Sequence, residues 1–129
     1  MSEPIVVIDT SAIRRGALAE VKAGIRELVS FVEQHVPGAL VYNVYLSEDG
    51  TRMTVLQMHP DSASMEHHME LGRPVFARFA ELLTMETMDI YGRPSERLLA
   101  LLQRKAQMLA GPGPTVHERH GGLLRFGPR

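Results

Sequence analysis

The elements predicted from the sequence come in the order strand, helix, two strands, helix and strand, with one further helix at the end. This order is the ferredoxin-like βαββαβ plan of α+β proteins, in which helices cover one face of an antiparallel sheet. Three observations predict it: a β-branched run at residues 4–9, a hairpin pattern at residues 39–59, and helical periodicity between and after them. We therefore expect an antiparallel sheet with an extra C-terminal helix.

The first half of the chain gives the first strand, a long helix and the hairpin. PIVVID at residues 4–9 predicts a strand, because β-branched residues favour extended backbone. From Ala17 the apolar residues recur at helical spacing until Pro37-Gly38 ends the pattern. ALVYNVYL and TRMTVLQMH flank the turn signal SEDG at residues 47–50, and this arrangement predicts a β-hairpin.

The second half predicts two helices around one more strand. Asp61 is placed to cap a helix that carries His67 and His68, and Gly72-Arg73-Pro74 is expected to interrupt that helix. Pro74 would then open a second helical segment. Residues 85–91 alternate as a strand. Ser95 would cap the last helix, whose apolar side holds Leu98, Leu101, Leu102 and Leu109.

Length and the Gly/Pro-rich end of the chain define the domain organisation. The 129 residues, 44% of them hydrophobic, suffice for one domain with its own core. We expect this ferredoxin-like domain to span residues 1–110. Residues 111–129 would form a C-terminal tail that is flexible or packs as an arm on a partner subunit.

The two faces of the predicted hairpin are both fairly apolar. A four-residue turn would pair Leu46 with Thr51, Val44 with Met53 and Tyr42 with Val55. Because side chains alternate along a strand, one face then collects the following residues: Leu40, Tyr42, Val44, Leu46, Met53, Val55, Gln57 and His59. We assign this face to the helices. The other face would be covered by a second copy of the chain, in a homodimer formed through Val41, Asn43, Tyr45, Leu56 and Met58.

Composition and charge exclude several classes of function. The chain has no cysteine, which excludes thiolate catalysis and cysteine metal sites, and its net charge of −1 argues against nucleic acid or an anionic membrane as partners. No apolar run is long enough for a secretory signal or a membrane span, so we expect a cytoplasmic protein. No glycine-rich phosphate loop and no nucleophile elbow occurs. Asp9 and Asp89 lie on different predicted strands and are weak candidates for paired carboxylates.

Three of the six histidines lie within ten positions, at His59, His67 and His68. Adjacent residues on a helix diverge by about 100°, so His67 and His68 are poorly placed to share a metal ion, and we expect no metal. His68 would point inward beside Met65, while His59 shares a strand face with Tyr42. A neutral imidazole in an apolar cavity can exchange protons near neutral pH. A buried histidine bonded to a backbone carbonyl is the commoner arrangement, and the sequence leaves both readings open.

The stretch PGALVYNVYLSEDGTRMTVLQMHPDSASMEHHM, followed by PVFARFAELL, resembles the antibiotic-biosynthesis-monooxygenase superfamily of dimeric α+β barrels. The resemblance implies a homodimer with a ligand cavity between sheet and helices in each subunit. Some members oxygenate quinols or polyketide aromatics without metal, flavin or other cofactor. On this model His68 is the catalytic base or the group that orients a phenolic oxygen, and Tyr42 hydrogen-bonds the substrate. The other expected substrate-binding residues are His59, Met53, Val55, Met65 and Phe76.

The sequence departs from this family pattern at three places. His59 stands where relatives often carry tryptophan, and Leu71-Gly72-Arg73 are apparent extra residues in the helical region. Haem-degrading relatives use an asparagine near the place of Asp9 and a tryptophan, which this chain lacks, so we do not expect haem degradation. The sequence thus predicts a cofactor-independent monooxygenase acting on a small aromatic or quinol. The alternative is a non-catalytic dimer of the same fold that binds a small apolar ligand.

Overall fold

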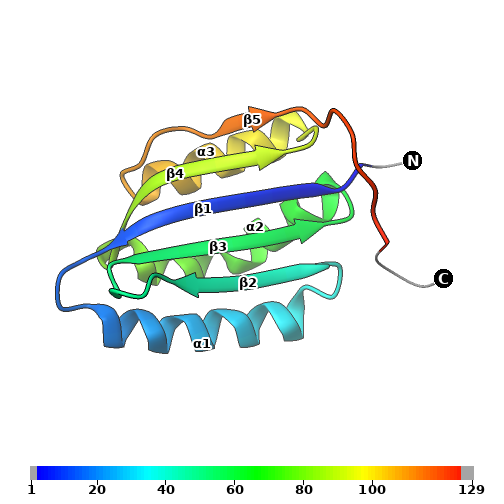
Figure 1. Cartoon of the computed structure of the whole chain (residues 1–129). Coiled ribbons are helices and arrows are strands. Elements are labelled where there is room, and N and C mark those ends of the chain that lie inside the picture. Colours follow the sequence, from blue (N-terminus) through cyan, green and yellow to red (C-terminus); the bar gives the residue numbers. More distant parts are fainter. Residues whose placement is uncertain (1–2, 126–129) are drawn as a thin grey trace.

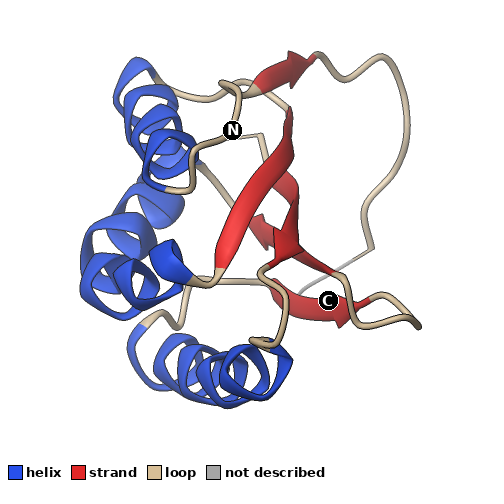
Figure 2. Ribbon diagram, turned by 90° about the vertical axis from the view of Figure 1, so that its left-hand side faces the viewer, coloured by secondary structure: helices blue, strands red, loops and turns tan. Residues whose placement is uncertain are grey.

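The computed structural model describes residues 3–125. Its elements, in chain order, are β1 (Ile5–Ile13), α1 (Leu18–His35), β2 (Val41–Leu46), β3 (Arg52–His59), α2 (Ser62–Ala77), the 3₁₀ helix η1 (Arg78–Glu81), β4 (Leu83–Tyr91), α3 (Glu96–Met108) and β5 (Thr115–His117). The strands form one sheet in the order β2-β3-β1-β4-β5 (Figure 1). All three α-helices cover the same face of this sheet, and the other face carries no helix (Figure 2).

This architecture confirms the predicted α+β class and the βαββαβ order. The first four strands are antiparallel, but β5 pairs in parallel with β4, so the sheet is mixed. The sequence analysis placed no strand in the tail. The three-residue β5 is held by a side-chain bond as well as by the ladder, since His117 Nε2 lies 2.8 Å from Asp89 Oδ1.

The first strand is longer than the β-branched run predicted. It extends to Ile13 because β1 is central and pairs with β3 on one side and β4 on the other. Strand pairing on both edges satisfies the backbone of the polar residues at its C-terminal half. Alternation then turns Ile5, Val7, Asp9 and Ser11 toward the helices, where all four are buried.

The helix α2 corrects one prediction, because it continues through Gly72-Arg73-Pro74 instead of being interrupted there. Its buried residues, Met65, His68, Gly72 and Phe76, follow one another at helical spacing across the proline. Pro74 itself is exposed, so the hydrogen bond that it cannot donate is lost on the solvent side of the helix. Packing of the continuous inner face therefore outweighs the local effect of the proline.

The hairpin register also differs from the predicted one, by two residues. Leu46 pairs with Met53, Val44 with Val55 and Tyr42 with Gln57. The connection is longer than a four-residue turn because Ser47 Oγ and Asp49 Oδ1 accept bonds from the Thr51 amide, which draws Thr51 out of the ladder. A shift of two residues keeps every side chain on its face. The predicted assignment of faces is therefore correct: Met53, Val55, Gln57 and His59 are buried beneath the helices.

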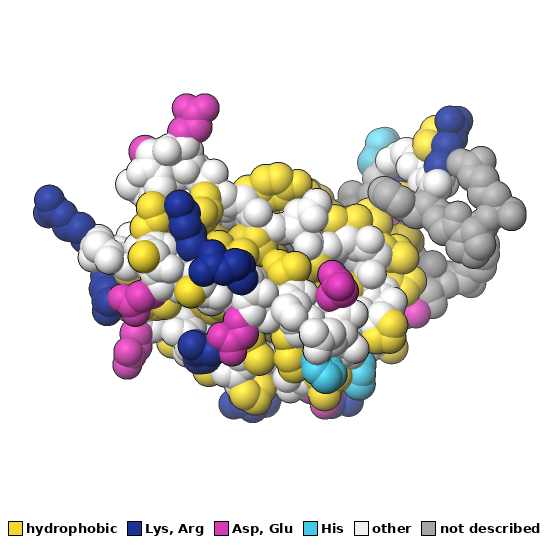
Figure 3. Space-filling model, turned by 90° about the horizontal axis from the view of Figure 1, so that it is seen from below, with side chains coloured by type: hydrophobic (Ala, Val, Ile, Leu, Met, Phe, Trp, Pro, Cys, Tyr) yellow, Lys and Arg dark blue, Asp and Glu magenta, His cyan; other side chains and the backbone are white. Residues whose placement is uncertain are grey.

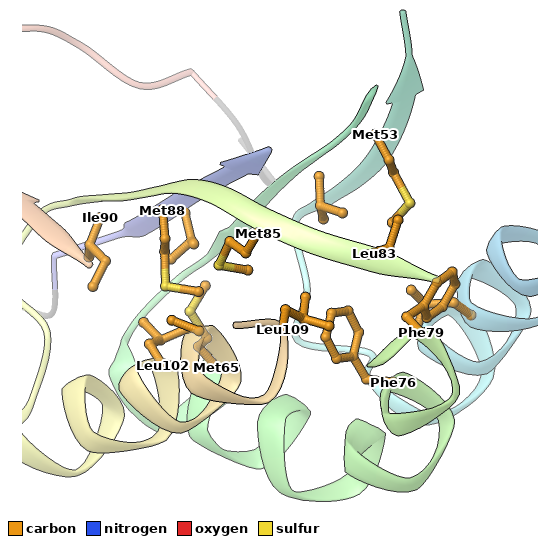
Figure 4. Packing of buried hydrophobic residues seen from close by; sticks show 14 of the residues in the cluster. Met53, Met65, Phe76, Phe79, Leu83, Met85, Met88, Ile90, Leu102 and Leu109 are labelled. Atoms are coloured by element: carbon orange, nitrogen blue, oxygen red, sulfur yellow. The ribbon is translucent and has the colours of Figure 1, made fainter. Parts of the chain in front are cut away.

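The core lies between the sheet and the three helices. Met85, Met88 and Ile90 point from β4 toward the helical layer, where Met65 and Leu102 meet them (Figure 4). The flexible thioethers of the methionines fill irregular space between the aromatic and branched side chains. This core surrounds the polar residues that are described in the next section.

The helix-free face of the sheet remains partly apolar. Tyr45 and Tyr91 are exposed there, and Val6 and Met58 line a groove that is also lined by Leu124 of the C-terminal segment, residues 118–125. Viewed from the side of α1, that segment projects from the body, and hydrophobic side chains lie among charged ones (Figure 3). No helix within residues 3–125 is long and apolar enough to cross a membrane.

Candidate functional site

A group of polar side chains, all buried except the partly buried Tyr42, lies between the sheet and the helices. Its members come from five elements: Asp9 on β1, Tyr42 on β2, Gln57 and His59 on β3, His68 on α2 and Lys105 on α3. Strand pairing sets Gln57 directly between Tyr42 and Val7, and Asp9 two residues further along β1. The fold thus brings together, inside an apolar core, groups from positions 9 to 105 of the chain.

His68 is the residue around which this group is arranged. Its ring centre lies 5.4 Å from that of Tyr42 and 5.4 Å from that of His59. Burial, reinforced by the positive charge of Lys105, lowers the pKa of His68 to about 3, so its imidazole is neutral at physiological pH. Its Nδ1 is buried and has no hydrogen-bond partner in the part of the chain that the structure describes. His68 is therefore a neutral ring with a free nitrogen.

His59 is bonded at both of its ring nitrogens. Nε2–H lies 3.2 Å from Gln57 Oε1 and donates a hydrogen bond to it. Nδ1 lies 3.0 Å from Ser64 Oγ and accepts a hydrogen bond from this hydroxyl group. Burial lowers the pKa of His59 to about 4. Because Ser64 belongs to the first turn of α2 and Asp61 caps that turn, His59 fixes the start of α2 against the end of β3. Its bonding pattern is that of a structural residue.

The predicted residues fall into two groups around His68. A cavity of about 50 Å³ opens between α2 and α3; His68, Phe76 and Lys105 are buried along its wall, and the exposed Arg73 and Arg104 lie at its mouth. The other five expected substrate contacts lie outside the lining: Met53, Val55 and Met65 belong to the apolar core, and Tyr42 and His59 lie next to His68 on its sheet side. His67 is exposed on the outer side of α2, as its angle to His68 predicts.

Sequence reasoning missed Lys105, and it considered Asp9 only as a possible partner of Asp89. Lys105 Nζ lies 3.1 Å from Asp9 Oδ2 and 4.3 Å from the centre of the Phe76 ring. Asp9 does not meet Asp89, which faces the other side of the sheet and binds His117. The available signal was an aspartate at an inward position of the first strand and a lysine within the apolar stripe of the last helix.

Burial also fixes the protonation of Tyr42. Desolvation of its hydroxyl, with the nearby negative charge of Asp9, raises the pKa of Tyr42 far above its ordinary value. Tyr42 is thus a neutral hydrogen-bonding group. Among the described residues, no three histidine, aspartate or glutamate side chains gather in an arrangement that could hold a metal ion.

Fold and site together define a small α+β domain with a buried polar group at an internal cavity. Solved structures with this fold include MupZ from Pseudomonas fluorescens, with a TM-score of 0.76, 18% sequence identity and 96% of each chain covered. SnoaB from Streptomyces nogalater, a cofactor-independent oxygenase, has a TM-score of 0.61 at 12% identity, over 73% of this chain and 96% of its own. A protein from Caulobacter crescentus CB15, provisionally named an antibiotic biosynthesis monooxygenase, has a TM-score of 0.61 at 20% identity, over 69% of this chain and 88% of its own.

These similarities confirm, at the level of the fold, the resemblance to the antibiotic-biosynthesis monooxygenases. At identities of 12 to 20% they carry the fold alone. No protein-family model matches the sequence, and no curated protein is significantly similar to it. What the site does must therefore be argued from its residues.

Proposed function

We propose that the protein is a monooxygenase that oxidises a small aromatic or quinol substrate without metal or flavin, and that it works as a homodimer. The observation that carries this proposal is the buried His68, which lines a cavity with largely apolar walls, lies ring to ring 5.4 Å from Tyr42, and has no hydrogen-bond partner for Nδ1 among the described residues. The same fold in SnoaB, a cofactor-independent oxygenase, supports the class of reaction.

The reaction needs no external reductant. An electron-rich substrate RH₂ reacts with O₂ to give RO and H₂O, so the substrate itself supplies the electrons. What the protein must provide is deprotonation, orientation and a site from which bulk water is excluded. With a pKa of about 3, His68 is a weak base. Its role is then to bind the substrate oxygen through Nδ1 and orient it, with Tyr42 as a second hydrogen-bonding group.

The size of the cavity limits how a substrate enters. About 50 Å³ accommodates a few water molecules, whereas a cavity that holds benzene measures about 150 Å³. The cavity is lined in part by Met69 and Met108, which are both partly exposed, and methionine changes rotamer easily. We therefore expect an aromatic ring to widen the cavity by displacing these two side chains.

The dimer is proposed to form through the face of the sheet that carries no helix. Val41, Asn43, Tyr45, Leu56 and Met58 project from β2 and β3 on this side, and Tyr45 is 52% exposed. Four of these five residues are apolar or aromatic. Large apolar surfaces of this kind are typically covered by a partner, and a second copy offers a self-complementary cover.

Oxygen consumption by metal-free protein tests the oxygenase directly. The substrates are a panel of hydroquinones and polycyclic phenols, and the variants are His68→Ala and its exposed neighbour His67→Ala. We expect uptake that falls at least about 100-fold in His68→Ala and is unchanged in His67→Ala, because only His68 lies at the cavity. Absence of uptake with every compound would overturn the proposal and favour the alternative, a dimeric protein that binds a small ligand without turnover.

A further inference from the structure

The ion pair between Asp9 and Lys105 is unexplained by the roles given to His68 and Tyr42. Its two side chains are only 3% and 4% exposed, and 3.1 Å separates Nζ from Oδ2. An ion pair so deeply buried adds little to stability compared with apolar residues of similar volume, because both charges must be desolvated. Charged groups retained in such a place beside a cavity are candidates for a functional role.

Lys105 faces both the carboxylate and the cavity. It is one of the residues that line the cavity, together with His68, and its ammonium lies over the ring of Phe76. Asp9 lies behind it, on β1. A ligand that reached His68 would therefore meet a positive charge whose partner is a carboxylate.

The count of buried charges decides which group accepts a proton from such a ligand. Asp9 and Lys105 contribute one negative and one positive charge. If the hydroxyl proton of a ligand passed to neutral His68, four charges would be buried: the new oxyanion, the imidazolium and the original pair. If it passed to Asp9, the carboxyl group would become neutral and only two charges would remain, the oxyanion and Lys105. In an apolar interior the arrangement with fewer charges is favoured.

We propose that Asp9 and Lys105 form the proton-accepting and anion-binding centre of this site, and that its ligand is a small molecule with an acidic hydroxyl group, such as a phenol, a hydroquinone or an enol. The O–H bond of the ligand breaks and its proton passes to Lys105 Nζ, which lines the cavity, while Lys105 gives one of its own protons to Asp9 Oδ2, 3.1 Å away. Lys105 stays an ammonium, and the oxyanion replaces the carboxylate as its charged partner. The net charge of the three groups is zero before and after the transfer. This inference rests on the proposed function for the kind of substrate, and it assigns the deprotonation to residues other than His68.

Titration of a bound coloured phenol tests this assignment without any turnover. The probe is 4-nitrophenol, whose anion absorbs visible light, added to saturation between pH 5 and pH 9 in the presence of the intact protein. We expect the bound probe to ionise about one pH unit below the free probe, because a positive charge within a few ångströms stabilises the anion. A probe that binds only as the neutral phenol, or does not bind at millimolar concentration, overturns the proposal.

Substitutions separate the two roles within the pair. In Lys105→Met the bound probe should remain neutral at least one pH unit above the free one, because burial then acts without the compensating charge. At high pH the probe is already an anion, and Asp9→Asn should bind this anion more tightly than the wild type does, because the anion supplies the negative charge that Lys105 has lost. The double variant Asp9→Asn/Lys105→Met removes both charges and should bind the neutral probe only. Because it leaves no unpaired buried charge, it can be measured even if a single variant does not fold. Lys22→Met, on the exposed side of α1, is the matched control and should leave the titration unchanged.

Oxygen uptake distinguishes failure of this inference from failure of the proposed oxygenase. If the bound probe ionises at a lower pH than the free probe, but no substrate causes oxygen consumption, the Asp9–Lys105 assignment is supported and the proposed oxygenase is overturned. If oxygen consumption depends on His68, but the bound probe stays neutral in every variant, the oxygenase is supported and the Asp9–Lys105 assignment is overturned. If both hold, uptake in Asp9→Asn should recover above the pH at which the free substrate ionises, and a purely structural role of Asp9 would give no such recovery.

Discussion

Each of the two faces of this one sheet carries residues that depart from the usual distribution of polarity: polar groups buried within the apolar core on one face, and exposed aromatic rings on the other. On the face beneath the helices, the polar residues Asp9, Gln57 and His59 are almost fully buried, although burial of polar groups is costly. On the helix-free face, Tyr45 and Tyr91 are 52% and 40% exposed, although apolar and aromatic surface favours burial. The inner set lies on β1 and β3 and the outer set on β2 and β4 of the same sheet, so the difference concerns the side to which each residue points and not a separate layer.

The contrast between the two faces indicates whether a ligand or a partner accounts for these residues. A folding domain would be at least as stable with apolar residues in place of the inner charges, so these are expected to serve a ligand. The outer apolar residues would gain by being covered, so they are expected to serve a partner. Substitutions on one face should therefore change the stability of the subunit, and substitutions on the other should change its assembly.

The largest expected effect is that of breaking the inner ion pair. Lys105→Met leaves the Asp9 carboxylate buried without a partner, which should lower the free energy of unfolding by about 3–5 kcal/mol. Urea denaturation measures this change. The double variant Asp9→Asn/Lys105→Met should regain most of the loss, because no uncompensated charge remains. Equal destabilisation by the single and the double variant would show that packing, and not charge, accounts for the effect.

The second-largest expected effect is that acid lowers the free energy of unfolding, because two histidines of the inner face are buried in the neutral form. The pKa values of His59 and His68 in the folded protein are about 4 and about 3, below the ordinary value of 6.5. Below pH 6.5 the unfolded chain therefore binds protons that the folded chain does not, and stability falls as pH falls through the window from 6.5 to between 4 and 3. Between pH 7 and pH 5 we expect a loss of about 2 kcal/mol for each histidine.

Thermal unfolding across this pH range checks the expectation. His68→Leu should remove about half of the acid sensitivity, whereas His67→Ala, at an exposed position, should leave it unchanged. A pH profile that is the same in His68→Leu and in the wild type would contradict the burial of a neutral imidazole at this position.

The features that the sequence predicted well are those with a local period. Alternation along the hairpin placed Met53, Val55, Gln57 and His59 on the helix side, and this held even though the register was wrong by two residues. The register itself depended on the side-chain bonds of Ser47 and Asp49 within the turn, which no periodicity reveals.

The features that the sequence missed depend on contacts between distant segments. Asp9 and Lys105 are 96 residues apart, and neither belongs to a motif of fixed spacing. Lys105 lies three residues after Leu102 and four before Leu109, inside the stripe that the periodicity marked as apolar. Gly72-Arg73-Pro74 was predicted to interrupt the helix because the effect of these residues was judged locally, while the packing of His68, Gly72 and Phe76 keeps α2 continuous. The signal available in the sequence was a charged residue at an inward-facing position of two elements, Asp9 on β1 and Lys105 on α3.

A smaller effect is expected where the two faces meet the C-terminal segment. The ring of His117 stacks on Tyr91 at 4.6 Å and bonds Asp89, which holds β5 on the sheet edge. Because these groups are partly exposed, His117→Ala should lower the free energy of unfolding by only about 1 kcal/mol. Hydrogen exchange at Thr115–His117 should accelerate in the variant while the core strands stay protected. Unchanged exchange would show that the β4–β5 ladder alone holds the segment.

The smallest effect on the subunit, and the largest on assembly, is expected from the middle of the helix-free face. Leu56 lies between Asn43 and Ile8 there and is only partly buried, so Leu56→Lys can extend its charged end to solvent and should change subunit stability by less than about 1 kcal/mol. In a homodimer joined through this face, however, each lysine would bring a positive charge into an apolar interface, and the cost of desolvating it would oppose assembly. Sedimentation velocity at micromolar concentration should then show a dimer for the wild type and for Ala19→Lys, on the outer side of α1, and a monomer for Leu56→Lys. A wild-type monomer would remove the dimer and leave the apolar face without a self-complementary partner, whereas a dimer that persists in Leu56→Lys would move the interface to another surface.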